Sequence, residues 1–137
     1  MLKRRITVAI TCMLICIMVV GAISCYAASW SSEITLTLPA LNGSSTSSSA
    51  VLKTTDDTTC SFYTSSVTGN ATPDARLLNS NGESRSNWAR NLSAGTYSYA
   101  TTTASKGYGY YAQVSSDLAQ LKNQSIRFKF SPDELTS

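Results

Sequence analysis

The most specific structural signal in the chain lies in residues Ala75–Leu92, ARLLNSNGESRSNWARNL, where two extended runs meet at Asn81–Gly82. Asn-Gly is the dipeptide that best tolerates the positive φ angles of a type I′ turn, the turn that most often closes a two-residue hairpin loop. A loop of that length places Leu77 opposite Ser86. The stretch therefore predicts an antiparallel β-hairpin in the body of the chain.

Segments on both sides of this hairpin alternate apolar and polar residues with the period of two that half-buried strands show. The clearest are ITLTL at 34–38, TTCSFYT at 58–64 and IRFKF at 126–130. The serine-rich stretch 42–50 has no period and predicts a flexible loop, and 116–123 has room for one helical turn at most. We expect an all-β fold, a small antiparallel β-sandwich of immunoglobulin-like or jelly-roll-like type with about seven or eight short strands.

The amino-terminal segment has the order of a secretory signal peptide. Basic residues at 3–5 precede an apolar run at 6–23, and small residues follow before the sequence turns polar. We expect cleavage of residues 1–27, which leaves one domain at residues 28–137.

Two other interpretations of this segment stay open. The apolar run approaches the length of about 20 residues that spans a bilayer, so an uncleaved anchor is one alternative. Residues 21–25 also resemble a degenerate bacterial lipoprotein box, so a lipoprotein tethered through Cys25 is the other.

The net positive charge of the chain comes from this amino-terminal segment. Three of the 11 lysines and arginines fall within it, which leaves 8 basic against 8 acidic residues and lowers the formal net charge from +3 to zero. A neutral chain with scattered charges gives no support to nucleic-acid binding. We expect no nucleic-acid partner, no membrane span in the mature form, and a monomer.

Catalysis has little support in the composition. The chain has no histidine, which removes the commonest general base and the usual partner of a nucleophilic serine or cysteine. Cys60 is the only cysteine beyond the leader, and its alternation with Phe62 predicts a buried, inert thiol. A carboxylate pair is the remaining catalytic option, and its candidates lie mostly at predicted turns: Asp56, Asp57, Asp74, Glu83, Asp117, Asp133 and Glu134. We expect a protein that is not an enzyme.

No cofactor is expected either. Zinc ligands are lacking, and Asp56–Asp57 as a calcium site is a weaker interpretation than a solvated turn, because no spaced acidic loop accompanies it.

The tyrosines follow strand parity. On the strand that begins at residue 108, the apolar face includes Ala112 and Val114, and Tyr111 lies on the other face. On the preceding strand the small residues 96, 98 and 100 form the polar side. We expect four tyrosines to point inward: Tyr97, Tyr99, Tyr108 and Tyr110.

Trp88 allows two interpretations. In the predicted hairpin it faces Ala75 beside Leu77, which favours a place in the core. Alternatively, residues 85–90, RSNWAR, form a sugar- or peptide-binding strip, with an indole for stacking and two guanidiniums for polar recognition. With the outward Tyr111, the candidate surface contacts are Arg85, Trp88, Arg90 and Tyr111.

These features predict an exported bacterial protein that acts without catalysis as a binding or structural module at or outside the cell surface. We expect the protein to be secreted and its partner to be a cell-wall or surface component. Two alternatives remain: a secreted, bacteriocin-like antimicrobial effector, and the lipoprotein tethered through Cys25.

Overall fold

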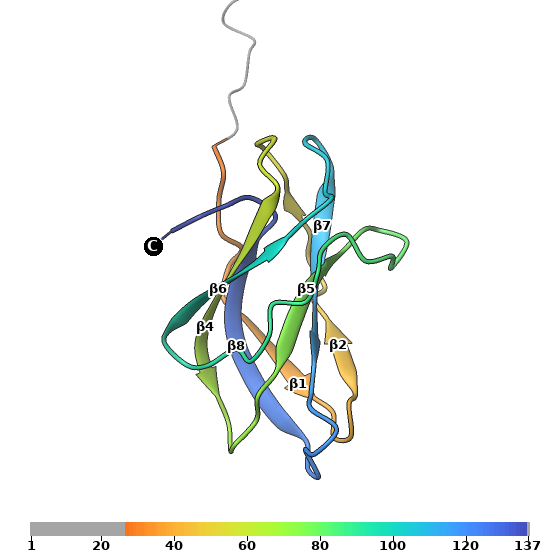
Figure 1. The fold of residues 1–137 in the computed structure, drawn as a ribbon, viewed down its shortest axis with the longest axis vertical. Helices are drawn as coiled ribbons and strands as arrows, with labels where there is room; N and C mark the ends of the chain where they lie inside the picture. Colours follow the sequence, from red (N-terminus) through yellow and green to blue (C-terminus); the bar gives the residue numbers. More distant parts are fainter. Residues whose placement is uncertain (1–26, 137) are drawn as a thin grey trace, which may run out of the picture.

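The computed structural model describes residues 27–136, which form strands and loops without a helix (Figure 1). One antiparallel sheet has the order β1 (Ile34–Leu38), β8 (Gln124–Ser131), β4 (Thr59–Val67) and β6 (Thr96–Thr101). In the other, all three neighbours pair with β7 (Gly109–Ser115): β2 (Ser44–Thr46), β3 (Val51–Leu52) and β5 (Asp74–Leu78). The prediction of an all-β sandwich is confirmed.

The two sheets pack on one hydrophobic core. Strands β4 and β8 contribute Phe62, Phe128 and Phe130, and the second sheet contributes Leu77 and Val114, all of them fully buried. Burial of a side chain of this size stabilises the fold by about 1.5–3 kcal/mol. The alternation predicted for the last strand is confirmed, because its charged residues lie on the opposite face.

Residues 1–26 lie outside the described residues, and with them nearly all of the predicted leader and Cys25. From residue 27 to residue 136, no helix is long and apolar enough to cross a membrane.

The predicted two-residue turn is wrong. The backbone N–H of Asn79 donates to the carbonyl of Glu83 at 2.9 Å, so the loop contains three residues, 80–82. Gly82 alone among them has a positive φ, 78°. The carboxamide oxygen of Asn79 accepts the backbone N–H groups of Asn81 (3.0 Å) and Glu83 (2.9 Å), which stabilises the wider loop.

The predicted pairing of Leu77 with Ser86 fails for the same reason. Arg85 donates its backbone N–H to the carbonyl of Leu77 at 2.8 Å, one position earlier than expected. Ser86 instead bridges Thr102, just beyond β6 in the other sheet. The return segment of the hairpin is therefore shared between the sheets.

Between Arg85 and Ala89 the return segment has two residues more than the facing part of β5, and these extra residues decide the position of Trp88. Ala89, not Trp88, pairs with Ala75, through backbone hydrogen bonds of 2.7 and 2.9 Å. Both alanines are buried, and Trp88 lies only half-buried on the outer side of the second sheet. The core position favoured for Trp88 is wrong.

Residues 42–50 are not the flexible loop that their composition predicts, because they contain β2. After β2 the backbone N–H of Ser47 donates to Ala112 at 2.8 Å, and its buried hydroxyl accepts the N–H of Ala112 at 3.0 Å. The serine side chain thus replaces a backbone carbonyl in the ladder, a role that composition does not reveal.

Only one of the four tyrosines expected to point inward does so. Tyr110 is 4% exposed, whereas Tyr97, Tyr99 and Tyr108 are 42%, 42% and 66% exposed. On β6 the register opposes Phe62 to the small Ser98, so the large rings of β6 take the outer face. Tyr108 lies one residue before β7 begins, so the alternation of inward and outward side chains along β7 does not set its direction.

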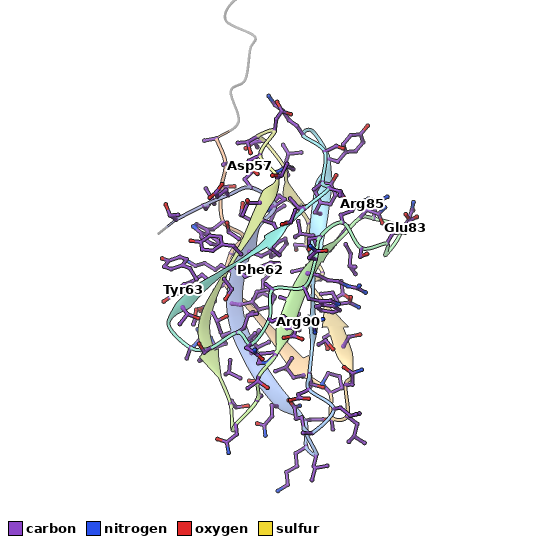
Figure 2. All side chains as sticks on the ribbon, viewed as in Figure 1. Asp57, Phe62, Tyr63, Glu83, Arg85 and Arg90 are labelled. Carbon is purple, nitrogen blue, oxygen red and sulfur yellow. The ribbon has the colours of Figure 1, made fainter. Side chains whose placement is uncertain are left out.

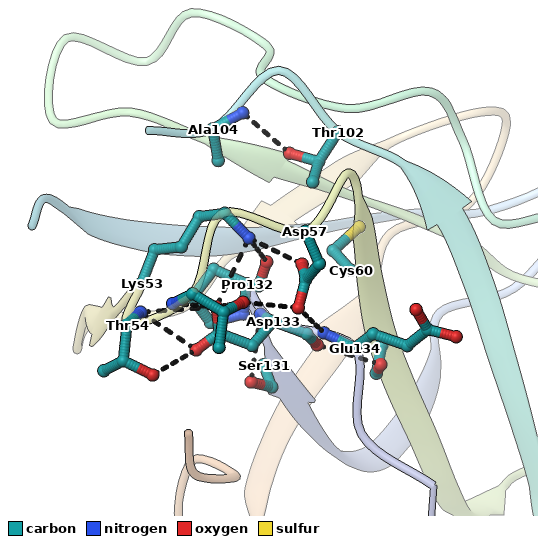
Figure 3. A network of polar contacts seen from close by, with 12 residues as sticks. Lys53, Thr54, Asp57, Cys60, Thr102, Ala104, Ser131, Pro132, Asp133 and Glu134 are labelled. Atoms are coloured by element: carbon teal, nitrogen blue, oxygen red, sulfur yellow. Dashed lines mark hydrogen bonds and ion pairs between the residues drawn. The ribbon is translucent and has the colours of Figure 1, made fainter. Parts of the chain in front are cut away.

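A buried charge cluster lies where the chain crosses from β3 in one sheet to β4 in the other (Figure 3). The ammonium of Lys53 donates to Asp57 (2.8 Å), to the carbonyl of Pro132 (2.8 Å) and to Asp133 (3.3 Å). The side chains of Lys53 and Asp133 are fully buried. We call these residues, with Thr54 and Thr55, the Lys53 cluster.

The carboxylate of Asp133 is saturated with donors. It accepts the backbone N–H groups and the hydroxyls of Thr54 and Thr55, at 2.7–3.2 Å. Burial alone raises the pKa of Asp133, but these hydrogen bonds outweigh it and lower the pKa below its ordinary value. The segment after β8 is thereby fastened to the loop between the sheets.

Replacement of Asp133 by asparagine is expected to destabilise the protein by about 3–5 kcal/mol, because it leaves the buried ammonium of Lys53 without its deepest partner. Urea denaturation followed by circular dichroism measures this. Asp56→Asn, in the same loop but exposed, serves as the control and is expected to change stability by less than about 0.5 kcal/mol. Equal effects would contradict the role of the cluster.

The pH dependence gives a second readout of the same cluster. Because the folded-state pKa of Asp133 lies below the ordinary value, its contribution is complete above the ordinary carboxyl pKa and is lost as the pH falls through the lowered folded-state pKa. The wild-type protein should therefore lose more stability on acidification than Asp133→Asn does.

Candidate functional site

The outer face of the second sheet forms the floor of the candidate site. On β7, Ala112 and Val114 are fully buried, whereas Tyr111 and Gln113 lie on the other face and are half-buried. On β5, Arg76 shares this outer face and stands directly opposite Gln113 in the register. The return segment after the hairpin adds its own outward side chains along the β5 edge.

Trp88 is the centre of one group on this face. The guanidinium carbon of Arg76 lies 4.3 Å from the centroid of the indole, and that of Arg90 lies 5.8 Å away. Arg76 also donates from Nε to the side-chain oxygen of Gln113 at 2.7 Å. Stacking and this hydrogen bond together fix the plane of the Arg76 guanidinium.

Arg90 is held from the other side. Its Nη1 donates to Asp74 Oδ2 at 2.5 Å, and the other oxygen of Asp74 accepts the backbone N–H of Asn91 at 2.9 Å. Asn91 has a positive φ, 56°, which turns the chain so that its N–H meets this carboxylate. Arg90 remains 65% exposed, so it presents a positioned cation to solvent.

Together these side chains border an open groove of about 380 Å³. We call it the Trp88 groove. Besides Trp88, Arg76 and Arg90, it is lined by Asn42, Ser44, Asp74, Gln113 and Ser115. The lining combines one aromatic ring, two cations, the carboxylate of Asp74 and several neutral hydrogen-bonding groups.

The other two predicted contact residues lie at a second hollow. Arg85 and Tyr111 help to line a depression of about 510 Å³, together with Tyr108. Arg85 is paired with Glu83 at 3.0 Å (Figure 2). Because Tyr111 and Gln113 share one face of β7, the two hollows open on the same side of the molecule.

The structure thus groups the four predicted contacts in two pairs, Trp88 with Arg90 and Arg85 with Tyr111. Sequence analysis missed Arg76. The residue alternates with the apolar Ala75 and Leu77, so strand periodicity alone places it on the outer face of β5. It also missed Gln113, because the pairing of β5 with β7 joins segments 37 residues apart.

The thiol of Cys60 and two of the carboxyls considered for catalysis, those of Asp57 and Asp133, lie outside the Trp88 groove. Cys60 is buried, and burial raises the pKa of its thiol to about 11. Asp57 and Asp133 are brought together, since both accept the hydroxyl of Thr55. For both carboxyls, burial raises the pKa, but hydrogen bonds outweigh it and lower the pKa, so neither holds a proton at neutral pH. Within residues 27–136, no group of three or more metal-ligating side chains occurs.

No protein-family model matches this chain, and no curated protein is significantly similar to it.

The outward position of Trp88 predicts a modest role in stability. Trp88→Ala is expected to cost about 1–2 kcal/mol, because the indole is only half-buried, whereas Phe62→Ala in the core should cost about 3–5 kcal/mol. Urea denaturation of the two variants measures the difference. A cost for Trp88→Ala as large as that for Phe62→Ala would mean that the indole is buried in solution.

Proposed function

We propose that this protein is an exported, non-catalytic binding module that acts at or outside the cell surface, where the Trp88 groove binds a carboxylate-bearing component of the envelope. The observation that carries this proposal is the guanidinium of Arg76, stacked on Trp88 and locked to Gln113. Export and release are inferred from the leader sequence alone.

The chemistry of Arg76 favours a carboxylate ligand. Its Nε is used by Gln113, and among the described residues no carboxylate pairs with its terminal nitrogens. A guanidinium whose plane is already fixed loses little conformational entropy when it binds a carboxylate through two parallel hydrogen bonds. Arg90 adds a second guanidinium, whose charge Asp74 offsets in part, and Ser44 and Asn42 add neutral hydrogen-bonding groups.

A binding role is also favoured over catalysis. The chain contains no histidine, its buried thiol is held protonated, and the carboxylates of Asp57 and Asp133 both pair with Lys53. A preformed groove with positioned charges, whose one carboxylate, Asp74, already accepts from Arg90 and Asn91, is suited to recognition.

For the fold type, we propose the jelly-roll alternative. The chain passes between the sheets after almost every strand, and the last strand, β8, lies between the first, β1, and β4. This order suits two interlocked Greek keys. The architecture fixes no activity by itself.

Titration calorimetry tests the groove with two acidic probes, a glutamate-rich hexapeptide and a hexamer of galacturonic acid, against a glutamine-rich hexapeptide. We expect both acidic probes to bind, and the tighter one identifies the source of the carboxylate. Arg76→Ala should weaken binding about tenfold to a hundredfold, because a hydrogen bond to a charged group contributes about 1.5–3 kcal/mol.

Arg127→Ala is the matched control, because it removes the same charge from the outer face of the first sheet. Its effect on binding should be less than about twofold. The proposal fails if neither acidic probe binds, or if the two arginine variants weaken binding equally, since equal losses indicate unspecific attraction.

A further inference from the structure

The outer face of the first sheet carries a second group of side chains, which sequence parity assigned in part to the core. Tyr63 on β4 and Tyr97 on β6 are direct partners in the register, with ring centroids 4.7 Å apart. Trp30 lies 6.0 Å from Tyr97, and Tyr99 follows on the same face of β6. We call these four residues the aromatic platform. Figure 2 shows Tyr63 on the outer side of β4, with Phe62 toward the interior.

Trp30 reaches this platform from the segment before β1. The next residue, Ser31, donates its backbone N–H to the carbonyl of Phe130 at 2.8 Å, and its hydroxyl accepts the N–H of Phe130 at 3.0 Å. These bonds extend the pairing with β8 beyond β1. They place the indole beside Lys129, the outward neighbour of Phe130.

The platform retains free polar groups at its surface. In the structure of residues 27–136, the phenol hydroxyls of Tyr63, Tyr97 and Tyr99 make no hydrogen bond, and Lys129 forms no ion pair. The ammonium of Lys129 lies 5.4 Å from the ring of Tyr63 and 5.9 Å from that of Trp30. Donors and acceptors therefore border the rings without being used by the protein.

The surroundings of the platform limit its charge. Arg127 and Glu33 at the β1 side form an ion pair, and Ser65 donates to the same carboxylate at 2.5 Å. Lys129 is thus the one unpaired charge beside the rings among the described residues. A strongly anionic partner such as a lipid surface would need several more basic groups than this face offers.

A second copy of the chain does not suit this face. Tyr97 and Tyr99 are each 42% exposed, so together they offer on the order of 200 Å² of ring surface, about a quarter of the roughly 800 Å² per partner of a stable interface. The exposed leucines, which a protein partner would use, lie in other segments: Leu41, Leu52, Leu118 and Leu121. The platform exposes flat aromatic rings with hydroxyls and no large aliphatic side chain.

We propose that the aromatic platform binds a neutral glycan chain, as a second ligand surface opposite the Trp88 groove and independent of it. The electron-rich faces of Tyr97 and Tyr99 stack on the C–H faces of sugar rings. The two tyrosines lie on one strand at i and i+2, about 6.5–7 Å apart along it, so an extended chain contacts both. The tyrosine hydroxyls and Lys129 hydrogen-bond to sugar hydroxyls.

Calorimetry with cellohexaose and chitohexaose tests this proposal on the purified protein. We expect at least one hexasaccharide to bind, and Tyr97→Ala and Tyr99→Ala each to weaken its binding about tenfold or more. Tyr97→Phe keeps the ring, and it should lose much less affinity than Tyr97→Ala does.

Two controls separate this surface from the rest of the molecule. Tyr108→Ala removes a tyrosine that is 66% exposed beside the second sheet, and it should leave glycan binding unchanged. Arg76→Ala should also leave it unchanged, which separates failure here from failure of the Trp88 groove. Circular dichroism confirms that each variant is folded.

Three outcomes would overturn the proposal. The first is that neither hexasaccharide binds. The second is that Tyr108→Ala weakens binding as much as Tyr97→Ala does. The third is self-association of the protein that Tyr97→Ala abolishes, detected by sedimentation velocity, because the occupant of the platform is then a second copy of the chain.

Discussion

The ion pair between Lys53 and Asp133 is the interaction on which the arrangement of the two sheets depends. Lys53 follows β3 in one sheet, and Asp133 follows β8 in the other. Isolated buried charges are costly, so the two side chains must remain together with the hydroxyls and N–H groups that surround them. The chain between the sheets is thereby held at one corner, and the sandwich has two fixed outer faces.

Those faces differ because β4 and β7 each bury one side. The buried side chains of β4, such as Phe62, leave Tyr63 outside, and the buried Ala112 and Val114 of β7 leave Gln113 outside. One face then collects tyrosines around a single lysine, and the other collects arginines around a tryptophan. Residues 28–137 carry as many acidic as basic side chains, and they can nevertheless present two surfaces of different chemistry.

Sequence reasoning succeeded where a strand buries large residues at every second position. The alternation of Phe128 and Phe130 identified β8, and that of Cys60 and Phe62 identified β4. It failed where one side chain changes the register, as the carboxamide of Asn79 does in widening the hairpin loop. It also failed for contacts between distant segments, because neither the Lys53 cluster nor the pairing of Arg76 with Gln113 leaves a local pattern.

The indole N–H signals of Trp30 and Trp88 in ¹H–¹⁵N NMR spectra can test the proposal that opposite faces of this sandwich bind different ligands, since each face carries one tryptophan. We expect a galacturonic acid hexamer to shift the Trp88 signal and to leave the Trp30 signal in place. A neutral hexasaccharide should shift the Trp30 signal only. Both signals moving together with either ligand, or neither moving with any, would contradict the proposal.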